Sequence, residues 1–247
     1  MHGSSCIGST PCFERGGPLE VKRMNWMVAD LVADSLCLMV RIEEDGSQRI
    51  FGSGFFFMDN DVVATAKHIL QDIEDSKTHC YLGVFTKEVP ELLQPIQCVY
   101  HSEQDLAFIK LNKPNSNVQP LQPGYKTEAG FIYAAYDPIA NRTFVARVPA
   151  FMTPPGRETN NSVTHFFEWN TPTMPGNSGG PLVGTDGGVV GILSGVVRRG
   201  SSANCEGHRD PTAQGIARAV FIGPLVDLYR RWKFFPGMIR EDFTPFR

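Results

Sequence analysis

The sequence has 247 residues, of which 42% are hydrophobic, and a formal net charge of -3 with acidic and basic residues interspersed. That length supports one large domain or two small ones, each able to bury a core. The nearly balanced charge excludes a strong electrostatic attraction to nucleic acid or to an anionic membrane, so we expect neither as a partner.

The chain divides into two strand-rich parts. Residues 1–23 are rich in Gly, Ser and Pro and predict a flexible extension. Residues 24–115 contain the short apolar runs SLCLMVRI, RIFGSGFFF, DVVATA, CYLGVF and LAFIKL. Residues 114–124, PNSNVQPLQPG, have the composition of a linker. Residues 116–233 continue with GFIYAAY, HFFEW, GVVGILSGVV and GIARAVFI, and residues 234–247 form a C-terminal tail.

Many short strands separated by turns are typical of an all-β fold, and the linker divides them into two antiparallel β-barrels. GTDGG, residues 184–188, predicts a hairpin connection between two strands. Near the end, Leu225, Leu228, Tyr229 and Trp232 recur at helical spacing. We expect a terminal α-helix that packs on the second barrel.

Features of secreted proteins are missing from the sequence. No apolar run approaches the roughly 18 residues of a membrane span, and the start of the chain lacks the apolar centre of a signal peptide. The six cysteines include no C-x-x-C pair and fit reduced thiols. We therefore expect a cytoplasmic, intracellular protein.

One stretch, TPTMPGNSGGPLVG, surrounds Ser178 with glycines and prolines. Glycine serves where the backbone needs φ > 0 or a close approach, and proline restricts the path into the bend. Taken alone, the stretch fits an ordinary surface turn equally well. It also matches the G-x-S-x-G elbow of α/β-hydrolases, but that fold needs its acid and histidine after the serine and a helix directly behind it. Two predicted strands follow here instead.

Two upstream residues complete a constellation with Ser178. His68 comes just after the strand in DVVATAKHIL, and Asp105 stands where the apolar strand of SEQDLAFIKL begins. Alone, each is more often structural than catalytic. Their order along the chain is His, Asp, Ser, and together with the bend at Ser178 they form a stronger signal than any of them alone.

These residues lie in motifs that resemble the chymotrypsin-like (trypsin-like) serine peptidase family over most of residues 35–233. ATAKH resembles T-A-A-H, DLAFIK resembles D-[IL]-A-L-[IL], and GNSGGPL resembles G-[DN]-S-G-G-P-L. ILSG and QGIARAV, followed by the amphipathic helix, match two further family segments. The resemblance implies a chymotrypsin-like pair of barrels and a catalytic triad of Ser178, His68 and Asp105.

By the same resemblance, the oxyanion hole consists of Gly176, Asn177 and Ser178, with the N–H groups of Gly176 and Ser178 as donors. His68 takes the serine proton, and Asp105 fixes the tautomer of His68. The other histidines, including His101 and His165, receive no role.

The sequence departs from the secreted members of this family. Asn177 replaces the Asp that pairs with a newly cleaved N-terminus, and Ile69 and Met174 stand where those members have disulfide cysteines. The closer resemblance is therefore to members that need no such cleavage, of the bacterial high-temperature-requirement and viral types.

The resemblance also outlines a substrate-binding region. Ser194–Val196 would hydrogen-bond an extended peptide, and the pocket for the side chain before the cut (P1) would be lined by uncharged groups. We expect small or medium aliphatic P1 residues. The residues assigned to substrate binding are Pro172, Thr173, Ser194, Gly195, Val196 and Gly215.

The main hypothesis is an active serine endopeptidase that acts on extended protein or peptide segments and uses no cofactor. Cys205 and His208 alone lack the ligand count of a structural zinc site, so we expect no metal. Two alternatives remain open: a catalytically silent domain that serves as a protein-binding scaffold, and a protease that stays latent until an activating partner binds.

Overall fold

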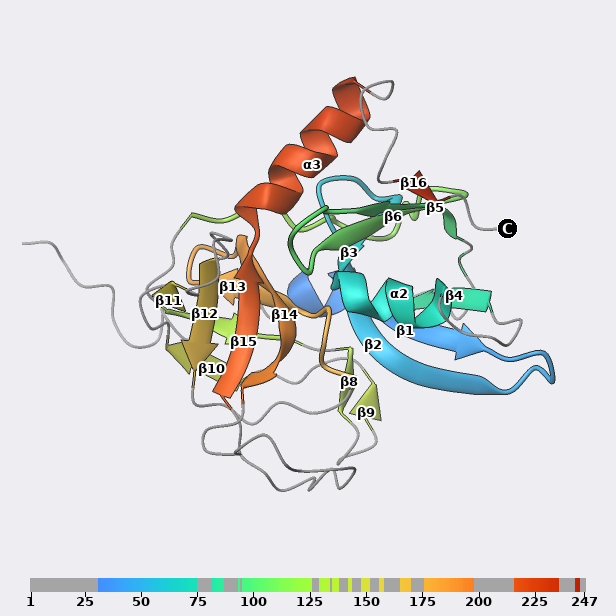
Figure 1. Ribbon diagram of the computed structural model, residues 1–247, viewed down its shortest axis with the longest axis horizontal. Helices are drawn as coiled ribbons and strands as arrows, with labels where there is room; N and C mark the ends of the chain where they lie inside the picture. The colour runs from blue at the N-terminus through green and yellow to red at the C-terminus, as the bar shows by residue number, and fades with distance from the viewer. Residues whose placement is uncertain are drawn as a thin grey trace, which may run out of the picture.

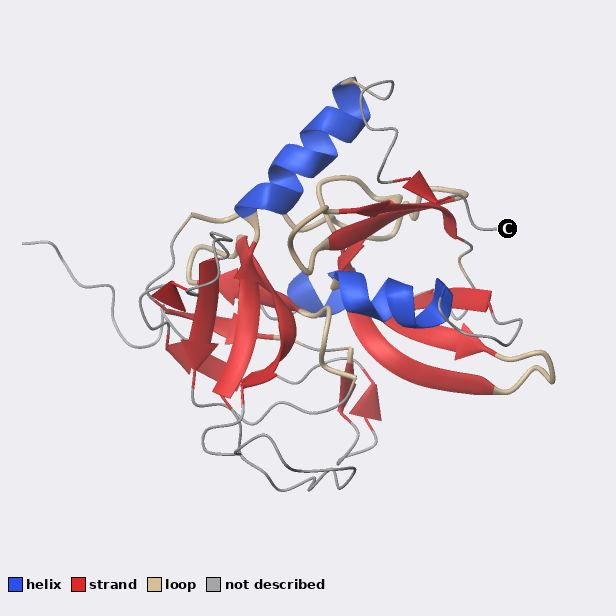
Figure 2. Cartoon of the chain, viewed as in Figure 1, coloured by secondary structure: helices blue, strands red, loops and turns tan. Residues whose placement is uncertain are grey.

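Two antiparallel sheets of seven strands each lie side by side and form the body of the protein (Figure 1). The structure is a computed structural model. It describes residues 31–74, 81–86, 93, 95–125, 129–133, 135–137, 142–143, 148–151, 156–157, 165–169, 176–197, 216–235 and 243–244. Strands dominate these residues and helices are few, which confirms the all-β prediction (Figure 2).

The first sheet has the strand order β16-β5-β6-β3-β2-β1-β4. Helix α2 (Lys67–Glu74) follows β3 directly along the chain. The last strand, β16, pairs with β5, so part of the predicted C-terminal tail belongs to this sheet. The bounds are β1 (Leu36–Ile42), β2 (Gln48–Phe56), β3 (Val62–Thr65), β4 (Tyr81–Thr86), β5 (Pro95–Tyr100), β6 (Ala107–Leu111) and β16 (Phe243–Thr244).

The second sheet has the strand order β10-β7-β13-β14-β15-β12-β11, and β8 pairs with β9 in a separate ribbon. Residues 184–188 connect β13 to β14 as a tight hairpin, in which the Gly184 N–H donates to the Gly188 carbonyl at 2.8 Å. That connection was predicted. The bounds are β7 (Ala129–Ile132), β8 (Tyr136–Asp137), β9 (Arg142–Thr143), β10 (Val148–Phe151), β11 (Gly156–Arg157), β12 (His165–Trp169), β13 (Pro181–Gly184), β14 (Val189–Val197) and β15 (Ile216–Phe221).

The apolar core explains why these runs form strands. Phe55 and Phe56 are both fully buried, and neighbouring side chains of a strand point to opposite faces, so β2 is covered on both sides. The same buried cluster includes Val189 and Val220 from the second sheet. The two sheets therefore share one continuous core at their junction.

The predicted linker is hydrogen-bonded to both sheets. The Leu121 N–H donates to the Phe56 carbonyl at 2.9 Å, and its own carbonyl accepts from Met58 at 3.0 Å. Three residues later, the Gly124 N–H donates to the Val189 carbonyl at 2.7 Å. The segment connects the two halves as expected, and its backbone pairing fixes one sheet to the other.

Helix α3 (Gly223–Phe234) confirms the predicted terminal helix, but its expected position on the second barrel is wrong. The residue just before it is tied to the second sheet, where the Ile222 N–H donates to the Val190 carbonyl at 3.1 Å. The aromatic residues in its outer half contact the first sheet instead, where the rings of Trp232 and Phe108 lie 5.1 Å apart.

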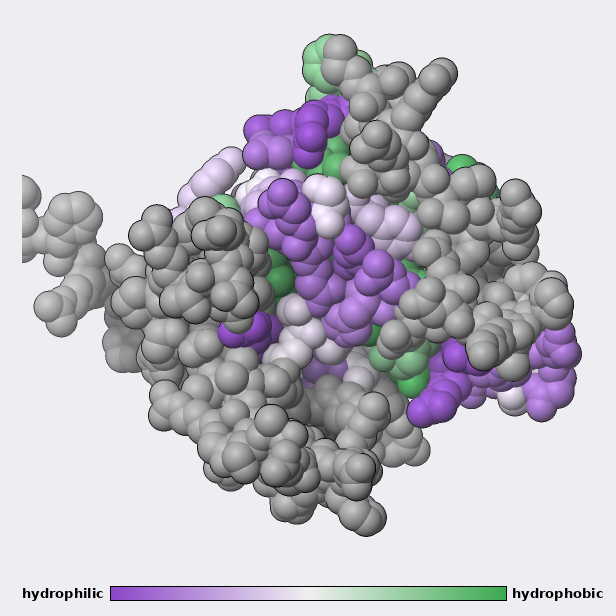
Figure 3. Space-filling view, viewed as in Figure 1, coloured by the Kyte–Doolittle hydropathy of each residue, from purple (hydrophilic) through white to green (hydrophobic). Residues whose placement is uncertain are grey.

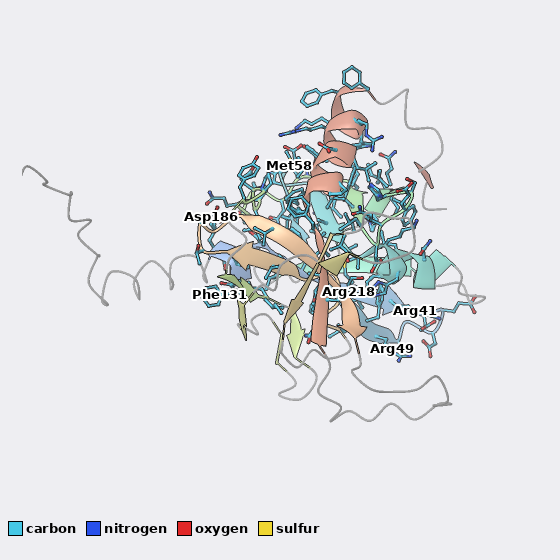
Figure 4. All side chains as sticks on the ribbon, turned by 60° about the vertical axis from the view of Figure 1, so that its left-hand side comes forward. Arg41, Arg49, Met58, Phe131, Asp186 and Arg218 are labelled. Carbon is cyan, nitrogen blue, oxygen red and sulfur yellow. The ribbon has the colours of Figure 1, made fainter. Side chains whose placement is uncertain are left out.

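Polar contacts hold the outer half of α3 to the same sheet. The Tyr229 hydroxyl donates to the Asp59 carboxylate, and Lys233 Nζ donates to Asp59 Oδ2 at 2.6 Å. Asp59 follows Met58, which has a φ of 62° and lies on the side of the molecule where α3 is found (Figure 4). The chain thus crosses from the second sheet back to the first through α3.

Within the described residues, no helix is long and apolar enough to cross a membrane. The domain boundaries at residues 23, 115 and 233 stay predictions.

Candidate active site

His68 and Asp105 come together because their strands are neighbours. His68 is the second residue of α2, just beyond β3, and Asp105 lies in the turn that leads into β6. The strands β3 and β6 pair through Thr65 and Ala107, so the end of one meets the start of the other. His68 Nδ1 lies 2.7 Å from Asp105 Oδ2, and the His68 backbone N–H donates to Oδ1 at 2.8 Å.

The Asp105 carboxylate also accepts a hydrogen bond from the Ser194 hydroxyl on β14 of the second sheet. Burial alone would raise the pKa of Asp105, but the hydrogen bonds from His68 and Ser194 and the nearby imidazole outweigh it and lower the pKa. Asp105 is therefore ionised at neutral pH and acts only as an acceptor. Because an ionised carboxylate cannot donate, the hydrogen between it and the ring belongs to Nδ1, and Nε2 of a neutral His68 carries the lone pair.

The turn that carries Asp105 is held by two further side chains. His101 Nδ1 accepts the N–H groups of Glu103 at 3.2 Å and Gln104 at 3.0 Å. Lys67 Nζ, from the residue next to His68, donates to the His101 carbonyl at 2.9 Å. These contacts tie the turn to itself and to the start of α2.

Ser178 lies on a turn that only glycine permits. Gly176 and Gly179 have φ values of 95° and 86°, in the left-handed region. A Cβ atom on Gly179 would lie 2.0 Å from the Ser53 carbonyl oxygen, and one on Gly180 would lie 2.2 Å from the Tyr133 carbonyl oxygen. The glycines of the motif therefore provide both the bend and the close approach.

The carbonyl oxygens of Gly176, Asn177 and Ser178 all accept hydrogen bonds. The Gly176 carbonyl accepts from the Ser53 hydroxyl at 2.7 Å, the Asn177 carbonyl from Gly180 N–H at 3.1 Å, and the Ser178 carbonyl from Ser53 N–H at 2.8 Å. Among the residues that the structure describes, no acceptor pairs with the N–H of Gly176 or of Ser178. Both remain available as donors beside the Ser178 side chain.

The same contacts connect the Ser178 turn to the strand that leads into His68. Ser53 on β2 bonds Ser178, and its carbonyl accepts from Thr65 Oγ1 at 2.9 Å, three residues before His68. Around this region, hydrophilic residues gather at the centre of the face shown in Figure 3, over α2 and the start of β6. Hydrogen bonds thus join His68, Asp105 and Ser194, and Ser53 ties the Ser178 turn to the strands β2 and β3 that precede His68.

A family comparison agrees with this geometry. Residues 52–192, more than half of the chain, match the family model described as the trypsin-like peptidase domain. The chain belongs to the trypsin-like peptidase family. Members of this family are serine endopeptidases, which are hydrolases, and the chymotrypsin-like fold expected from the motifs is confirmed.

Individual proteins that resemble this chain share less than a third of its residues in the aligned regions. Serine protease HTRA4 from Mus musculus is 29% identical over 147 residues, which cover 57% of this chain and 29% of the mouse protein. The chain therefore spans less than a third of that relative's length. Of the solved structures, Deg5 matches with a TM-score of 0.63 at 16% identity, over 87% of this chain and 97% of Deg5.

The HtrA-type protease AlgW with a bound tripeptide matches with a TM-score of 0.58 at 16% identity, over 85% of this chain and 63% of AlgW. Identities this low show the fold alone. What this chain shares with AlgW and Deg5 is therefore the fold.

Not every residue assigned from the sequence can be located. Pro172, Thr173 and Gly215 lie outside the described residues, and only the backbone of Val196 is described. Gly195 lies on β14, just after a register shift that leaves Ser194 without a partner position on β15. This shift accompanies the Ser194 hydroxyl contact with Asp105.

Sequence reasoning missed three side chains of this trypsin-like site: the hydroxyl groups of Ser53 and Ser194, and the His101 ring. One signal was present for Ser53. It stands between two glycines in a strand that continues with three phenylalanines, where a buried hydroxyl needs a partner. Ser194 was assigned to substrate binding through its backbone, and nothing in the sequence indicated a contact of its side chain with Asp105.

Proposed function

We propose that this chain is a serine endopeptidase in which Ser178 is the nucleophile, His68 the general base and Asp105 the group that orients His68. The observation that carries the proposal is the two-point contact between Asp105 and His68. It fixes the plane of the ring and leaves the proton-accepting lone pair on Nε2 of neutral His68.

The chemistry proceeds in two halves. Ser178 Oγ attacks the peptide carbonyl while its proton moves to His68 Nε2, and the carbonyl oxygen becomes an oxyanion. The N–H groups of Gly176 and Ser178 donate to that oxyanion, and Asn177 holds the two donors at a fixed spacing. The tetrahedral intermediate collapses, the amine leaves with the proton from His68, and water then hydrolyses the acyl-enzyme by the same route.

Strand β14 supplies a place for an extended substrate. Residues 195–197 pair with β15 along one edge, and among the described residues no strand pairs with residues 194–197 along the other edge. A peptide that aligns with Ser194–Val196 would add a strand there, with backbone hydrogen bonds that do not depend on its side chains. This arrangement favours extended segments of proteins as substrates.

The P1 preference follows from the family alignment of the pocket. Pro172 at its base has no charge to pair with Lys or Arg, and Val196 in its wall narrows it relative to a glycine. Thr173, Gly195 and Gly215 complete the assigned lining. We propose small or medium aliphatic P1 residues, with a graded preference of about 1 kcal/mol per methylene.

The cellular location is also a proposal. The Cys37 thiol is buried in β1, and burial raises its pKa, so it is an inert thiol rather than a reactive one. A buried thiol of this kind fits the reducing cytoplasm that the cysteine pattern predicts.

Turnover of a protein substrate such as casein tests the proposed function. Ser178→Ala should reduce cleavage to background while the protein stays folded, because only the nucleophile is lost. Ser47→Ala, on the exposed β1–β2 turn, is the matched serine control and should behave as wild type. Equal cleavage by wild type and Ser178→Ala would reject the proposal. A scaffold or a latent protease would instead show no cleavage by wild type.

A further inference from the structure

Ser53 is a polar residue at a fully buried position of β2, in a strand that otherwise supplies phenylalanines to the core. Its hydroxyl group makes two hydrogen bonds to the second half of the chain. Oγ donates to the Gly176 carbonyl at 2.7 Å and accepts the Ala135 N–H at 2.9 Å. A buried hydroxyl with both partners satisfied holds a fixed direction.

The direction of the hydroxyl proton follows from these partners. Ala135 N–H occupies an acceptor position of Oγ, and the single proton of the hydroxyl then serves the Gly176 carbonyl. The Ser53 backbone N–H bonds the Ser178 carbonyl as well. One residue of the first sheet therefore donates hydrogen bonds to the carbonyl groups at both ends of the segment 176–178.

The peptide unit between Gly176 and Asn177 lies between the two proposed oxyanion donors. The two proposed oxyanion donors belong to the peptide units on either side of it: the N–H of Gly176 precedes it and the N–H of Ser178 follows it. Gly176 has a φ of 95°, a region that glycine enters and leaves easily. Without an anchor on its carbonyl, the turn can rotate at Gly176 and move one donor relative to the other.

We propose that Ser53 is a positioning residue for catalysis, which fixes the Gly176–Asn177 peptide so that the two oxyanion donors stay aligned. The inference rests on the proposed serine endopeptidase function. Ser53 acts through the backbone of the turn and does not touch the substrate. The alignment of the donors therefore depends on a side chain from the opposite sheet.

The test compares two buried serine hydroxyls. Ser53→Ala removes the anchor, whereas Ser35→Ala removes a fully buried hydroxyl of the same kind, which donates to the Gln119 carbonyl at 2.5 Å far along the chain from the turn. Ser53→Cys keeps the size of the side chain and a weak donor, and it serves if the alanine variant does not fold.

We expect kcat to fall about 10- to 100-fold in Ser53→Ala with KM within about twofold, since misaligned donors weaken the transition state more than the bound substrate. Ser53→Cys should lose about 3- to 10-fold in kcat, because a thiol is a weaker donor, and Ser35→Ala should keep kcat within about twofold although it is less stable. Wild-type kcat in Ser53→Ala, or in Ser53→Cys if only that variant folds, would overturn the inference. So would an equal loss of kcat in Ser35→Ala.

Hydrogen exchange of the substrate-free protein separates this inference from the proposed function. The amides of Ala135, Gly179 and Gly180 are hydrogen-bonded in and around this turn, and they should exchange faster in Ser53→Ala than in Ser35→Ala, whether or not the wild type cleaves a substrate. Unchanged exchange would overturn the anchoring role of Ser53. Faster exchange together with an inactive wild type would leave the anchor in place and refute the peptidase function, and with it the catalytic meaning of the anchor.

Discussion

Asp105 accepts two hydrogen bonds from His68, one at each carboxylate oxygen: Nδ1 to Oδ2 at 2.7 Å and backbone N–H to Oδ1 at 2.8 Å. Two contacts from one residue fix the position of the ring as well as its tautomer. The Ser194 hydroxyl adds a third donor from the other sheet. The histidine is therefore oriented by residues of both halves of the molecule.

Replacement of this carboxylate tests its role. Asp105→Asn should lower kcat about 10⁴-fold, because an amide can stabilise the wrong tautomer of His68. The wild-type rate should fall on acidification, because a protonated His68 cannot accept the proton of Ser178. The variant lacks the negative charge that stabilises the imidazolium, so the acid limb of its residual activity should move to lower pH.

The pH profiles of kcat/KM for both proteins check this prediction. Asp186→Asn, on the exposed β13–β14 hairpin, is the matched control and should follow the wild type. Near-wild-type activity of Asp105→Asn would contradict the role given to Asp105.

The turn at Ser178 makes a prediction about stability. Gly179→Ala should destabilise the protein by about 4 kcal/mol or more, because the new methyl meets the Ser53 carbonyl at 2.0 Å and the residue has a φ of 86°. Gly195→Ala is the matched control, since nothing lies within 4 Å of its Cβ position and its φ is ordinary. Thermal unfolding compares them. Equal unfolding temperatures for the two variants would contradict the close contact between the Ser178 turn and β2.

The contact of α3 with the first sheet makes a prediction about pH. Burial raises the pKa of Asp59, but hydrogen bonds from Lys233 and Tyr229 outweigh it and hold the pKa below its ordinary value. Burial and Asp59 together raise the pKa of Tyr229 to about 12. A carboxyl group with a lowered pKa stabilises the fold above its ordinary pKa, and that contribution disappears as the pH falls through the lowered value.

Asp59→Asn should therefore reduce the free energy of unfolding by about 1 kcal/mol at neutral pH, a modest amount because the pair is partly exposed. The difference from wild type should shrink below about pH 4. Asp227→Asn, an exposed position on the same helix, should change little. Denaturant unfolding at several pH values measures both, and a constant difference down to pH 2 would contradict the ion pair.

The structure gives His101 a role in positioning Asp105 that the sequence did not indicate. Because its Nδ1 accepts two N–H groups of the turn before Asp105, His101→Ala should lower kcat about 3- to 10-fold through a displaced carboxylate, with little change in KM. His165→Ala, on β12, should keep wild-type kinetics. Steady-state kinetics distinguish the two, and identical values for both variants would remove His101 from the site.

Local patterns made much of this predictable from the sequence. The strands follow short apolar runs, the β13–β14 hairpin follows GTDGG, and the order His68, Asp105, Ser178 follows family motifs. Each of these signals depends on residues close together in the chain. The pairing of β3 with β6, which joins His68 to Asp105, follows from the fold that those motifs imply.

What the sequence did not predict depends on contacts between distant residues. Ser53 and Gly176 are 123 residues apart, and Ser194 and Asp105 are 89 apart. The helical spacing of Leu225 to Trp232 showed which face of α3 is buried but not which sheet buries it. The contacts of Tyr229 with Asp59 and Phe108 show that this face lies against the first sheet.

The most direct test of the account is the intact mass of the protein after treatment with a fluorophosphonate. An activated serine attacks the phosphorus and fluoride leaves, so the account predicts one covalent adduct per chain, mapped to Ser178, and slowed at a pH where His68 is protonated. Ser178→Ala should remain unmodified. An unmodified wild-type chain, or an adduct at a residue other than Ser178, would contradict it.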